Sequence, residues 1–414
     1  MNHPTTASAG ASALAANTIH DVADIAARLR AAQPQWQDLG VVERVGWLNR
    51  LRDWLDSNET RVTDVLRQDV DATPASAARD RRMAVAAIEA VTANAAEYLG
   101  GRHPRPNGAG GAFGLDVGAR RCRLVGVLAP WTSPLCLSLQ AAAAALLAGA
   151  AVLAKPSVRS PAAARVLAEG WGAVGAPAVF AAVYGRNLGP AVVDAVDYVR
   201  FTGAADTGRA VAHRAAERLI PCRLEVGGKA PAVVLADADL GHAAAGIARG
   251  GLTDNGRLCA AIERVYVEDP IYDAFVEALV AEVDTGWRHC EDAEGACAVG
   301  DPDARVASLL DHVNDAVARG AAVRIGGRGA DGVFEPTVLT GVDQSMAVMT
   351  EQTYGPILPV MRVRDADHAV LLANDGYFGR AASIWAGDRA RAARIAADLT
   401  AGSVDINEPD VHLR

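Results

Sequence analysis

The amino-acid sequence predicts an α/β protein whose parallel sheets are covered by helices. From about Leu124 onward, short apolar runs alternate with helical segments, which is the pattern of a parallel sheet covered on both faces. The chain has 414 residues, of which 51% are hydrophobic and 21% charged, so it is long enough for two or three domains. The net charge of −9 argues against nucleic acid or an anionic membrane as the main partner.

The N-terminal part is predicted to be a tail followed by a layer of helices. Met1–Thr18 is rich in Ala, Ser and Thr and has no Lys or Arg, so we expect a disordered tail and no secretory signal. From Ile19 to about Leu99, apolar residues recur at the three- and four-residue spacing of helices. One such face is formed by Val41, Val45, Leu48, Leu51 and Leu55. The Gly-, Pro- and Arg-rich stretch from Gly100 to Gly118 is predicted to be a loop or a hairpin arm.

The central part is predicted to contain most of the strands. The predicted strands are Leu124–Leu128, Ala151–Ala154, Ala178–Val183, Tyr198–Phe201, Cys222–Val226, Ala232–Leu235 and Arg264–Val267. The predicted helices between them include Pro134–Leu147, Pro161–Glu169 and Asp206–Arg218. Parallel sheets of this kind bind ligands at the carboxyl ends of their strands, so the candidate site is expected there.

A second alternating block completes the chain. Its predicted helices are Ala274–Val283, Val306–Arg319 and Asp388–Leu399, and its predicted strands are Val323–Ile325, Ser383–Trp385 and Ser403–Ile406. The sequence therefore predicts two successive α/β units after the helical layer.

Three segments place reactive or phosphate-binding groups near predicted strand ends. In the segment from Phe201 to Gly208, two glycines lie where a helix begins, and helix N-termini favour phosphate. Glu225 ends a strand before two glycines and suits either a general base or a structural ion-pair partner. Cys259 follows a glycine-containing loop, where a thiolate surrounded by backbone donors is a good nucleophile, although a lone cysteine more often serves packing.

Taken together and in order, these segments resemble the signature blocks of the aldehyde dehydrogenase superfamily. The other matching blocks are Ala129-Pro130-Trp131, Lys155-Pro156-Ser157, Tyr354-Gly355-Pro356, Ala373-Asn374-Asp375 and Ala401-Gly402-Ser403-Val404. The resemblance implies a Rossmann-type cofactor domain, an α/β catalytic domain and a β-arm for oligomerisation. We expect residues 19–226 to bind NAD(P), with the arm at about 103–123, and residues 227–414 to form the catalytic domain.

The resemblance also implies a reaction and a set of site residues. Cys259 would attack an aldehyde, the backbone N–H of Cys259 and the side chain of Thr132 would face the oxyanion, and Glu225 would activate the water that hydrolyses the thioester. Lys155 would hold the adenosine ribose of NAD or NADP. The full set of expected cofactor-binding residues is Pro130, Trp131, Lys155, Ser157, Val158, Arg159, Phe201, Thr202, Gly203, Ala204, Gly208, Glu225, Val226, Gly227, Gln352 and Tyr354.

Several of these positions depart from the family pattern. Thr132 stands where the family has the Asn that donates to the oxyanion, and losing one such donor typically costs about 10²–10³ in rate. Val158 stands where many NAD-using members have a Glu that repels a 2′-phosphate. Since Arg159 follows, we hypothesise that NADP is accepted. Three further differences are Ala204 for a Ser in the phosphate turn, Gln352 for a Glu at the nicotinamide ribose, and Ser133 for an aromatic residue in the substrate tunnel.

The resemblance also bears on partners, compartment and the end of the chain. The six cysteines show neither a disulfide framework nor metal-ligand spacing, so we expect a reducing cytoplasm and no metal. The chain stops at Arg414, where related chains continue into a strand that pairs with a neighbouring subunit. The arm around Gly111–Arg123 would then keep an unpaired edge, so we expect a homo-oligomer to be weakened.

Three other hypotheses compete with aldehyde oxidation. A catalytically impaired homologue with a binding or scaffold role is favoured by the departures at positions such as Thr132 and Gln352, and opposed by Cys259, Glu225 and Lys155. Acyl transfer to coenzyme A is opposed by Glu225, because members of that type tend to lack the base. A metal-dependent hydrolase is disfavoured because the nine histidines show no paired-ligand spacing.

Overall fold

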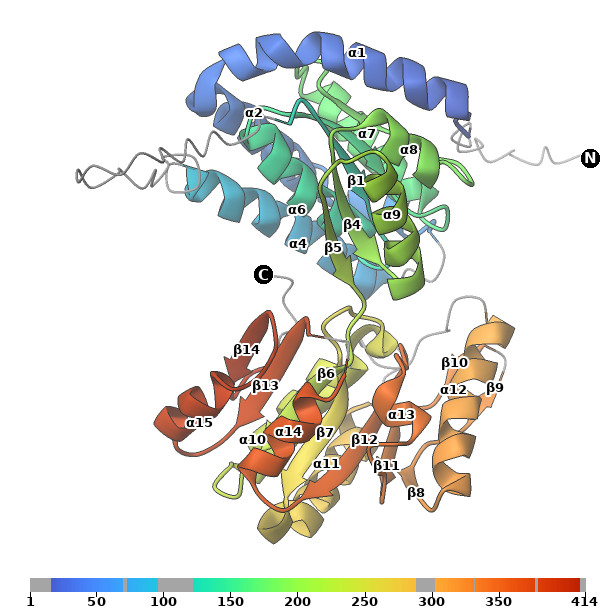
Figure 1. The fold of residues 1–414 in the computed structure, drawn as a ribbon, viewed down its shortest axis with the longest axis vertical. Helices are drawn as coiled ribbons and strands as arrows, with labels where there is room; N and C mark the ends of the chain where they lie inside the picture. Colours follow the sequence, from blue (N-terminus) through green and yellow to red (C-terminus); the bar gives the residue numbers. More distant parts are fainter. Residues whose placement is uncertain are drawn as a thin grey trace, which may run out of the picture.

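The computed structural model describes residues 16–69, 73–95, 122–287, 302–330, 332–376 and 379–409. Two α/β parts lie one above the other along the longest axis (Figure 1). The first part contains a five-stranded sheet that ends with Val226, and the second contains a seven-stranded sheet that begins with Ala230. The predicted α/β class with parallel sheets is confirmed.

The predicted layer of N-terminal helices is confirmed. It consists of α1 (Ile19–Asp38), α2 (Gly40–Ser57), α3 (Glu59–Leu66) and α4 (Pro74–Ala93). Most of the predicted tail and of the predicted arm lies outside the described residues. The last residues of the predicted tail are ordered: Asn17 donates its N–H to the carbonyl of Tyr184 at 2.7 Å, and Thr18 forms a capping box with Asp21 at the start of α1.

The first sheet is entirely parallel, in the order β3-β2-β1-β4-β5. Its strands are β1 (Leu124–Leu128), β2 (Ala151–Lys155), β3 (Phe180–Ala182), β4 (Tyr198–Gly203) and β5 (Cys222–Val226). Its connecting helices are α6 (Pro134–Leu147), α7 (Pro161–Ala173), α8 (Gly189–Ala195) and α9 (Ala205–Glu217). The strand order reverses between β1 and β4, which is where such sheets open a crevice at their carboxyl ends.

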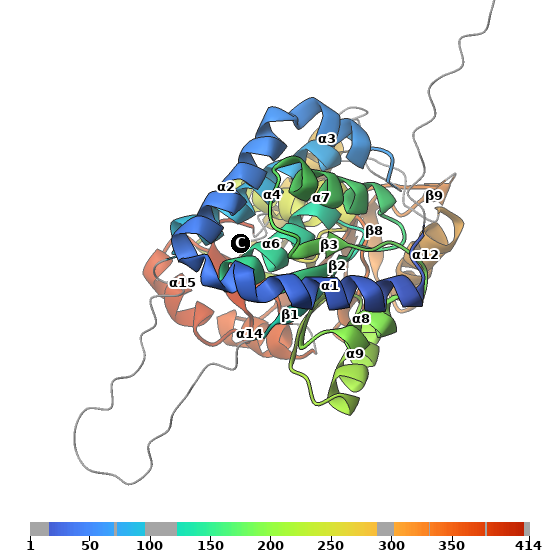
Figure 2. The ribbon, with the colours of Figure 1, turned by 90° about the horizontal axis from the view of Figure 1, so that it is seen from above.

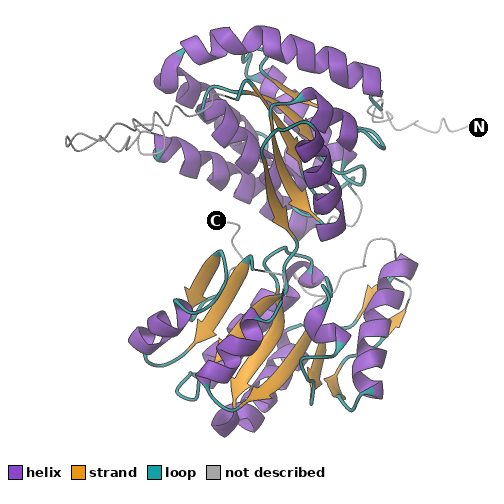
Figure 3. Cartoon of the chain, in the orientation of Figure 1, coloured by secondary structure: helices purple, strands orange, loops and turns teal. Residues whose placement is uncertain are grey.

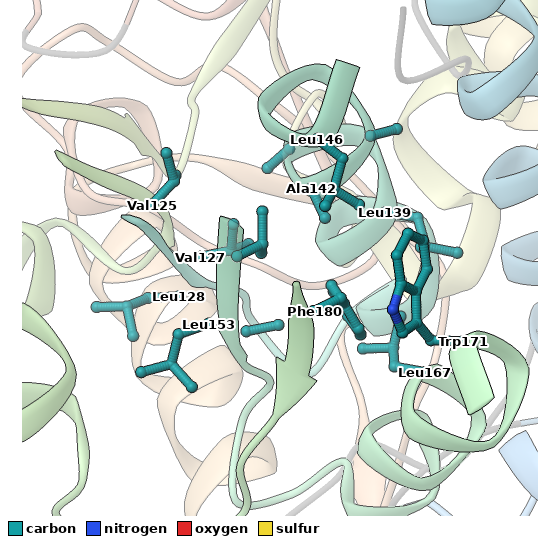
Figure 4. Packing of buried hydrophobic residues seen from close by; sticks show 14 of the residues in the cluster. Val125, Val127, Leu128, Leu139, Ala142, Leu146, Leu153, Leu167, Trp171 and Phe180 are labelled. Atoms are coloured by element: carbon teal, nitrogen blue, oxygen red, sulfur yellow. The ribbon is translucent and has the colours of Figure 1, made fainter. Parts of the chain in front are cut away.

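Helices cover the first sheet on both faces, as the apolar strand sequences require. Seen from above, α1, α8 and α9 lie on one side and α6 and α7 on the other, with α2, α3 and α4 outside them (Figure 2). The core is largely aliphatic: Val125 and Val127 share one face of β1 and belong to the same cluster as Leu139 and Leu146 of α6, whereas Leu128 and Leu153 lie on the other side of the strands (Figure 4). Full burial of each such side chain stabilises the fold by about 1.5–3 kcal/mol.

The second sheet has the order β14-β13-β6-β7-β12-β11-β8, and every pair is parallel except β8 with β11. Its strands are β6 (Ala230–Val234), β7 (Ile262–Glu268), β8 (Ala322–Ile325), β11 (Thr337–Thr340), β12 (Ile357–Val363), β13 (Ala381–Trp385) and β14 (Ser403–Ile406), and β9 (Gly329–Ala330) and β10 (Val333–Phe334) form a separate hairpin. Its helices are α10 (Leu240–Leu252), α11 (Tyr272–Gly286), α12 (Pro302–Ala318), α13 (Ala347–Thr350), α14 (Ala366–Asn374) and α15 (Arg389–Ala396). Figure 3 shows this sheet between its helices.

Alternation along β6 shows how the second sheet is buried. Ala232 and Val234 pack with α10 and α11 on one face, whereas Val233 and Leu235 pack with α12, α14 and α15 on the other. Both sets are fully buried, which explains why the strand is a continuous apolar run.

Two central strands of this sheet, β11 and β12, are missing from the sequence prediction. Pro359 within β12 hides that strand, because proline cannot donate to a ladder and is usually confined to edges. Here Pro359 is paired with Leu339 of β11, and the pairing of β12 with β7 begins only at Val360. Pro359 therefore lies where β12 pairs with β11 alone, so the N–H that proline lacks is not needed for pairing with β7.

Two buried carboxylates tie the helical layer to the first sheet. Asp80 of α4 accepts the backbone N–H groups of Leu135 and Cys136 at 3.0 and 2.8 Å, at the start of α6. Asp69 does the same for Ala162 and Ala163 at the start of α7. Burial raises the pKa of Asp80 to about 7 and that of Asp69 to about 6, although the backbone donors oppose the shift.

Replacing Asp80 with Asn is expected to remove a pH dependence of stability. Because the pKa of Asp80 is raised in the folded protein, its contribution is fully present below the ordinary value of 3.8 and is lost as the pH rises through about 7. Each unit of raised pKa corresponds to about 1.4 kcal/mol. Urea denaturation at several pH values should show wild type losing stability relative to Asp80→Asn as the pH rises. A difference in stability between wild type and Asp80→Asn that stays constant with pH would contradict the raised pKa of Asp80. Wild type should likewise lose stability relative to Asp69→Asn as the pH rises.

Candidate active site

A cavity of about 610 Å³ lies at the junction of the two parts. On the first sheet it is lined by residues at the carboxyl ends of β1, β2, β4 and β5. On the second it is lined by Gly227, Cys259, Gln352 and Tyr354, which precede β6, β7 and β12. The site therefore lies between the carboxyl edge of one sheet and the amino edge of the other.

Most of the residues expected in the site line this cavity. They are Pro130, Trp131, Thr132, Lys155, Ser157, Val158, Phe201, Thr202, Gly203, Ala204, Glu225, Gly227, Cys259, Gln352 and Tyr354. Arg159, Gly208 and Val226 are not among the lining residues. Gly208 and Val226 pack closely together, because a Cβ added at Gly208 would lie 2.8 Å from Cγ1 of Val226. The same Cβ would lie 3.2 Å from the ring of Phe201, which lines the cavity.

The wall formed by the first sheet fits a dinucleotide. Gly203, Ala204 and Thr207 line the cavity at the start of α9, where backbone N–H groups favour a pyrophosphate. Lys155 and Val158 line the same cavity beyond β2, and burial lowers the pKa of the Lys155 ammonium. Glu225 is the only acidic residue among those that line the cavity in the described part of the chain.

Arg159, which was expected at the cofactor, packs against an aromatic ring. Its guanidinium carbon is 4.6 Å from the ring centroid of Trp131, which is a cation–π contact, and its backbone N–H donates to Oγ of Ser157. The Arg159 side chain therefore packs on Trp131, and its neighbour Val158 lines the cavity.

Cys259 follows a tightly wound loop. Asp254, Asn255 and Gly256 all have left-handed backbone angles, with φ of 55°, 57° and 65°. Left-handed conformations are costly for non-glycine residues, so surrounding contacts must hold them. One such contact is the ion pair between Asp254 and Arg257, whose Oδ1 and Nη2 atoms lie 3.0 Å apart. Cys259 lies just after this loop, where it is half-buried and lines the cavity.

Glu225 is surrounded by arginines. Its carboxylate lies 3.0 Å from Arg200, 3.5 Å from Arg223 and 3.3 Å from Arg380, and its side chain is 18% exposed. Arg380 precedes β13, so this pair also joins the two parts of the molecule. Both hypotheses for Glu225 therefore have a structural basis: it faces the cavity, and it is an ion-pair partner.

Thr132 and Tyr354 are joined by a hydrogen bond between their hydroxyl groups at 3.0 Å. Tyr354 has a left-handed backbone with φ of 54°, and its ring makes an edge contact with Trp131. Burial raises the pKa of Tyr354 to about 12, so the phenol stays protonated at neutral pH. Next to it, Gly227 makes room for Gln352, since an added Cβ would lie 2.4 Å from the amide nitrogen of that side chain.

A buried ion pair between Lys229 and Glu263 holds the segment that contains Tyr354. Nζ of Lys229 lies 3.0 Å from the Glu263 carboxylate and donates to Oγ1 of Thr353 at 2.7 Å. Glu263 in turn accepts the backbone N–H groups of Thr353 and Tyr354 at 2.7 and 3.0 Å. Both charged side chains are at most 2% exposed. Burial lowers the pKa of Lys229, and the charge of Glu263 opposes that shift.

Several residues of the site were missed by the sequence analysis. Arg305 of α12 lines the cavity and lies 5.1 Å from the ring centroid of Tyr354, and burial lowers the pKa of its guanidinium. Glu263, Arg200 and Arg380 were missed because their roles depend on strands that meet only in the folded chain. Lys229 could have been picked out from the sequence, because it directly follows the glycine pair after Glu225.

Other kinds of site are not found in the described part of the chain. No group of three or more His, Cys, Asp or Glu residues there could hold a metal ion. None of the helices there is long and apolar enough to cross a membrane.

The fold and the cavity together define a class of protein. A parallel sheet with a cavity at the reversal of its strand order, and with a helix N-terminus on that cavity, is the arrangement of enzymes that bind dinucleotides. The opposite wall presents a cysteine thiol, which suits covalent chemistry on a carbonyl compound. These features indicate a nicotinamide-dependent oxidoreductase.

Comparison with known proteins identifies the family. Residues 2–413 match the Aldehyde dehydrogenase family. A Mycobacterium bovis protein provisionally named succinate-semialdehyde dehydrogenase [NADP(+)] 2 is 34% identical over 408 residues, which cover 94% of this chain and 77% of that protein. Vanillin dehydrogenase of Pseudomonas fluorescens is 36% identical over 327 residues, which cover 74% of this chain and 65% of that enzyme.

Solved structures agree with this assignment. The NADP-dependent glyceraldehyde-3-phosphate dehydrogenase of Bacillus halodurans C-125, solved in complex with NADP, superposes with a TM-score of 0.83 at 28% identity. The alignment covers 95% of this chain and 84% of that one. The chain therefore belongs to the aldehyde dehydrogenase family, and it is an NAD(P)-dependent enzyme that oxidises an aldehyde to a carboxylic acid.

The buried ion pair provides a test of this architecture. Glu263→Gln is expected to lower the free energy of unfolding by about 3–5 kcal/mol, because it leaves Lys229 buried without its counter-charge. The matched control is Glu169→Gln, which breaks the exposed pair with Arg61 and should cost at most about 1 kcal/mol. Chemical denaturation of both variants measures these changes. Equal and small losses would show that the Lys229–Glu263 pair does not anchor the site.

Proposed function

We propose that Cys259 is the nucleophile, Glu225 the base, and the first part of the chain the cofactor domain. The observation that carries this proposal is the cavity, in which Cys259 and Glu225 lie together with the glycine turn at the start of α9. Residues 19–226 would hold the dinucleotide, and residues 227–414 would supply the thiol. The boundary falls between Val226, which ends β5, and Ala230, which begins β6.

The first half-reaction would take place at Cys259. The thiolate attacks the aldehyde carbon, a C–S bond forms, and the carbonyl π electrons move onto oxygen. The backbone N–H of Cys259 would donate to that oxygen. When bound, NAD(P)+ accepts the hydride from the former aldehyde carbon. Cys259 is then left as a thioester, oxidised by two electrons relative to the aldehyde.

The second half-reaction would need Glu225. Water adds to the thioester carbon, Glu225 accepts its proton, the C–S bond breaks, and the carboxylic acid leaves with the Cys259 thiolate regenerated. In the structure, three arginines compete with water for the Glu225 oxygens. The carboxylate therefore has to turn away from Arg200 and Arg380 before it can serve as the base.

The cofactor would be NADP at least as readily as NAD. Val158, which lines the cavity, would face the ribose, and the only acidic lining residue among those described, Glu225, lies on β5. A 2′-phosphate would therefore meet no carboxylate, while Lys155 lines the same cavity. The Mycobacterium bovis relative is also named for NADP. Because Arg159 packs on Trp131, this proposal rests on Val158 and Lys155.

The substrate would be a small aldehyde, and the enzyme would work in a reducing compartment. The names of the relatives direct a first screen to succinate semialdehyde and vanillin. Among the described residues, Cys136 and Cys222 are free thiols, which supports a reducing compartment such as the cytoplasm as the site of action.

Calorimetric titration with NADP and NAD tests the cofactor proposal. NADP is expected to bind as tightly as NAD or more tightly. Val158→Glu should weaken NADP binding by at least about tenfold and leave NAD binding largely unchanged, because a new carboxylate would repel the 2′-phosphate. Clearly tighter binding of NAD by the wild-type protein would overturn the proposal. If neither NADP nor NAD binds, the proposal that this cavity holds a dinucleotide is wrong.

Replacing Glu225 with Gln tests the assignment of the base. The first turnover should still release reduced cofactor, because Cys259 and the oxyanion donors remain. Steady-state turnover should fall by about 10²–10⁴ because the thioester is no longer hydrolysed efficiently. Stopped-flow absorbance gives both rates, and mass spectrometry should detect acylated Cys259. Cys259→Ala is the control that should show neither phase. An unchanged steady-state rate would mean that Glu225 is only an ion-pair partner.

A further inference from the structure

Thr132 lacks the amide donor that an asparagine would have, and the hydroxyl of Tyr354 lies next to it. The threonine side chain is shorter than an asparagine and has no amide N–H. In the structure its hydroxyl lies 3.0 Å from the hydroxyl of Tyr354, and both residues line the cavity that Cys259 enters. A tyrosine hydroxyl therefore lies beside the position where the amide of an asparagine would be expected.

Three separate contacts hold Tyr354 in place. Glu263 accepts its backbone N–H at 3.0 Å, which helps to hold the left-handed φ of 54°. Its ring lies edge-on to Trp131, with the centroids 6.1 Å apart, and the Arg305 guanidinium lies 5.1 Å from the ring centroid. A donor fixed in advance by backbone, ring and hydroxyl contacts meets the requirement for electrostatic stabilisation of a transition state.

The position of Thr132 is equally constrained. It is 7% exposed, and the helix that begins two residues later, α6, is anchored by the carboxylate of Asp80 through Leu135 and Cys136. Its hydroxyl can donate to the oxygen of Tyr354, which leaves the phenolic hydrogen available for an acceptor in the cavity. Such a chain of two hydroxyls strengthens the terminal donor, because each hydrogen bond polarises the next.

We propose that the phenolic hydroxyl of Tyr354 is the second oxyanion donor of this enzyme and that Thr132 positions it. The inference rests on the proposed role of Cys259. As the thiolate attacks the aldehyde, negative charge develops on the carbonyl oxygen between the backbone N–H of Cys259 and the Tyr354 hydroxyl. The phenol donates a hydrogen bond and transfers no proton. When hydride leaves, the carbonyl re-forms and the hydrogen bond weakens.

The ionisation state of Tyr354 supports this role. Burial is the main cause that raises its pKa to about 12, and the charge of the nearby Cys259 also raises it. The phenol is therefore a neutral donor at working pH, and it lies close enough to Cys259 for the two groups to interact. A phenol is also a more acidic donor than a carboxamide, which strengthens its hydrogen bond to an anion.

Single-turnover kinetics with vanillin and with succinate semialdehyde, at saturating NADP, test the proposal. Tyr354→Phe removes only the hydroxyl and should slow the first release of NADPH by about 10²–10³. Thr132→Val should also slow this step, whereas Thr132→Ser, which keeps the hydroxyl, should lie near wild type. The decisive variant is Thr132→Asn combined with Tyr354→Phe. It restores an amide donor and should recover at least about tenfold of the lost rate.

Two controls separate this role from a structural one. The affinity for NADP and the rate at which iodoacetamide alkylates Cys259 should stay within about threefold of wild type in Tyr354→Phe, because the variant keeps the ring expected at the cofactor and neither measurement needs an oxyanion donor. A first turnover of Tyr354→Phe at the wild-type rate would overturn the proposal. So would a loss that Thr132→Asn does not rescue, or one matched by falls in affinity and alkylation. A first turnover that survives in Cys259→Ala would overturn the proposed role of Cys259 and this inference with it, whereas a wild-type first turnover in Tyr354→Phe alone overturns only the inference.

Discussion

The ion pair between Lys229 and Glu263 is the interaction on which the site depends. It joins the segments that precede β6, β7 and β12, and these segments carry Gly227, Cys259 and Tyr354. Burying two charges costs several kcal/mol, which is recovered only where further hydrogen bonds complete the pair. Here Thr353 and Tyr354 complete it with two backbone N–H groups. The pair therefore holds a turn whose left-handed residue would otherwise be unfavourable.

The arrangement of the two sheets explains why reactive groups gather at their junction. Parallel strands of the first sheet end there, so their loops and the N-terminus of α9 face the cavity. Strands of the second sheet begin there, so the residues before β6, β7 and β12 face the same space. Ion pairs such as Glu225 with Arg380 then connect the two edges. The cofactor side and the thiol side are thus built by different sheets and meet only in the folded chain.

Local patterns predicted much of this fold, and contacts between distant segments account for what they missed. The strand–helix alternation indicated β1 to β7 with small errors at their ends, and the signal is clearest for β1 and β6, which are continuous apolar runs. Pro359 concealed β12, since only the register with β11 shows how a proline is accommodated. In the site, the glycine turns and Cys259 were visible in the sequence. The arginines around Glu225, and the packing of Arg159 on Trp131, were not, because no sequence spacing encodes them.

The departures from the family pattern lie together in space, which changes their meaning. Taken one at a time, Thr132 and Gln352 each suggest a lost contact. In the folded chain, Thr132 hydrogen-bonds Tyr354, and Gln352 occupies the space that Gly227 leaves free. Arg305 adds a positive charge to this same wall, where a Glu at position 352 would have added a negative one. The local charge is thereby more positive than the family pattern implies, and a developing oxyanion is stabilised by positive potential. Thr132 and Gln352, which look like lost contacts in isolation, therefore both have neighbours in the cavity that Cys259 lines.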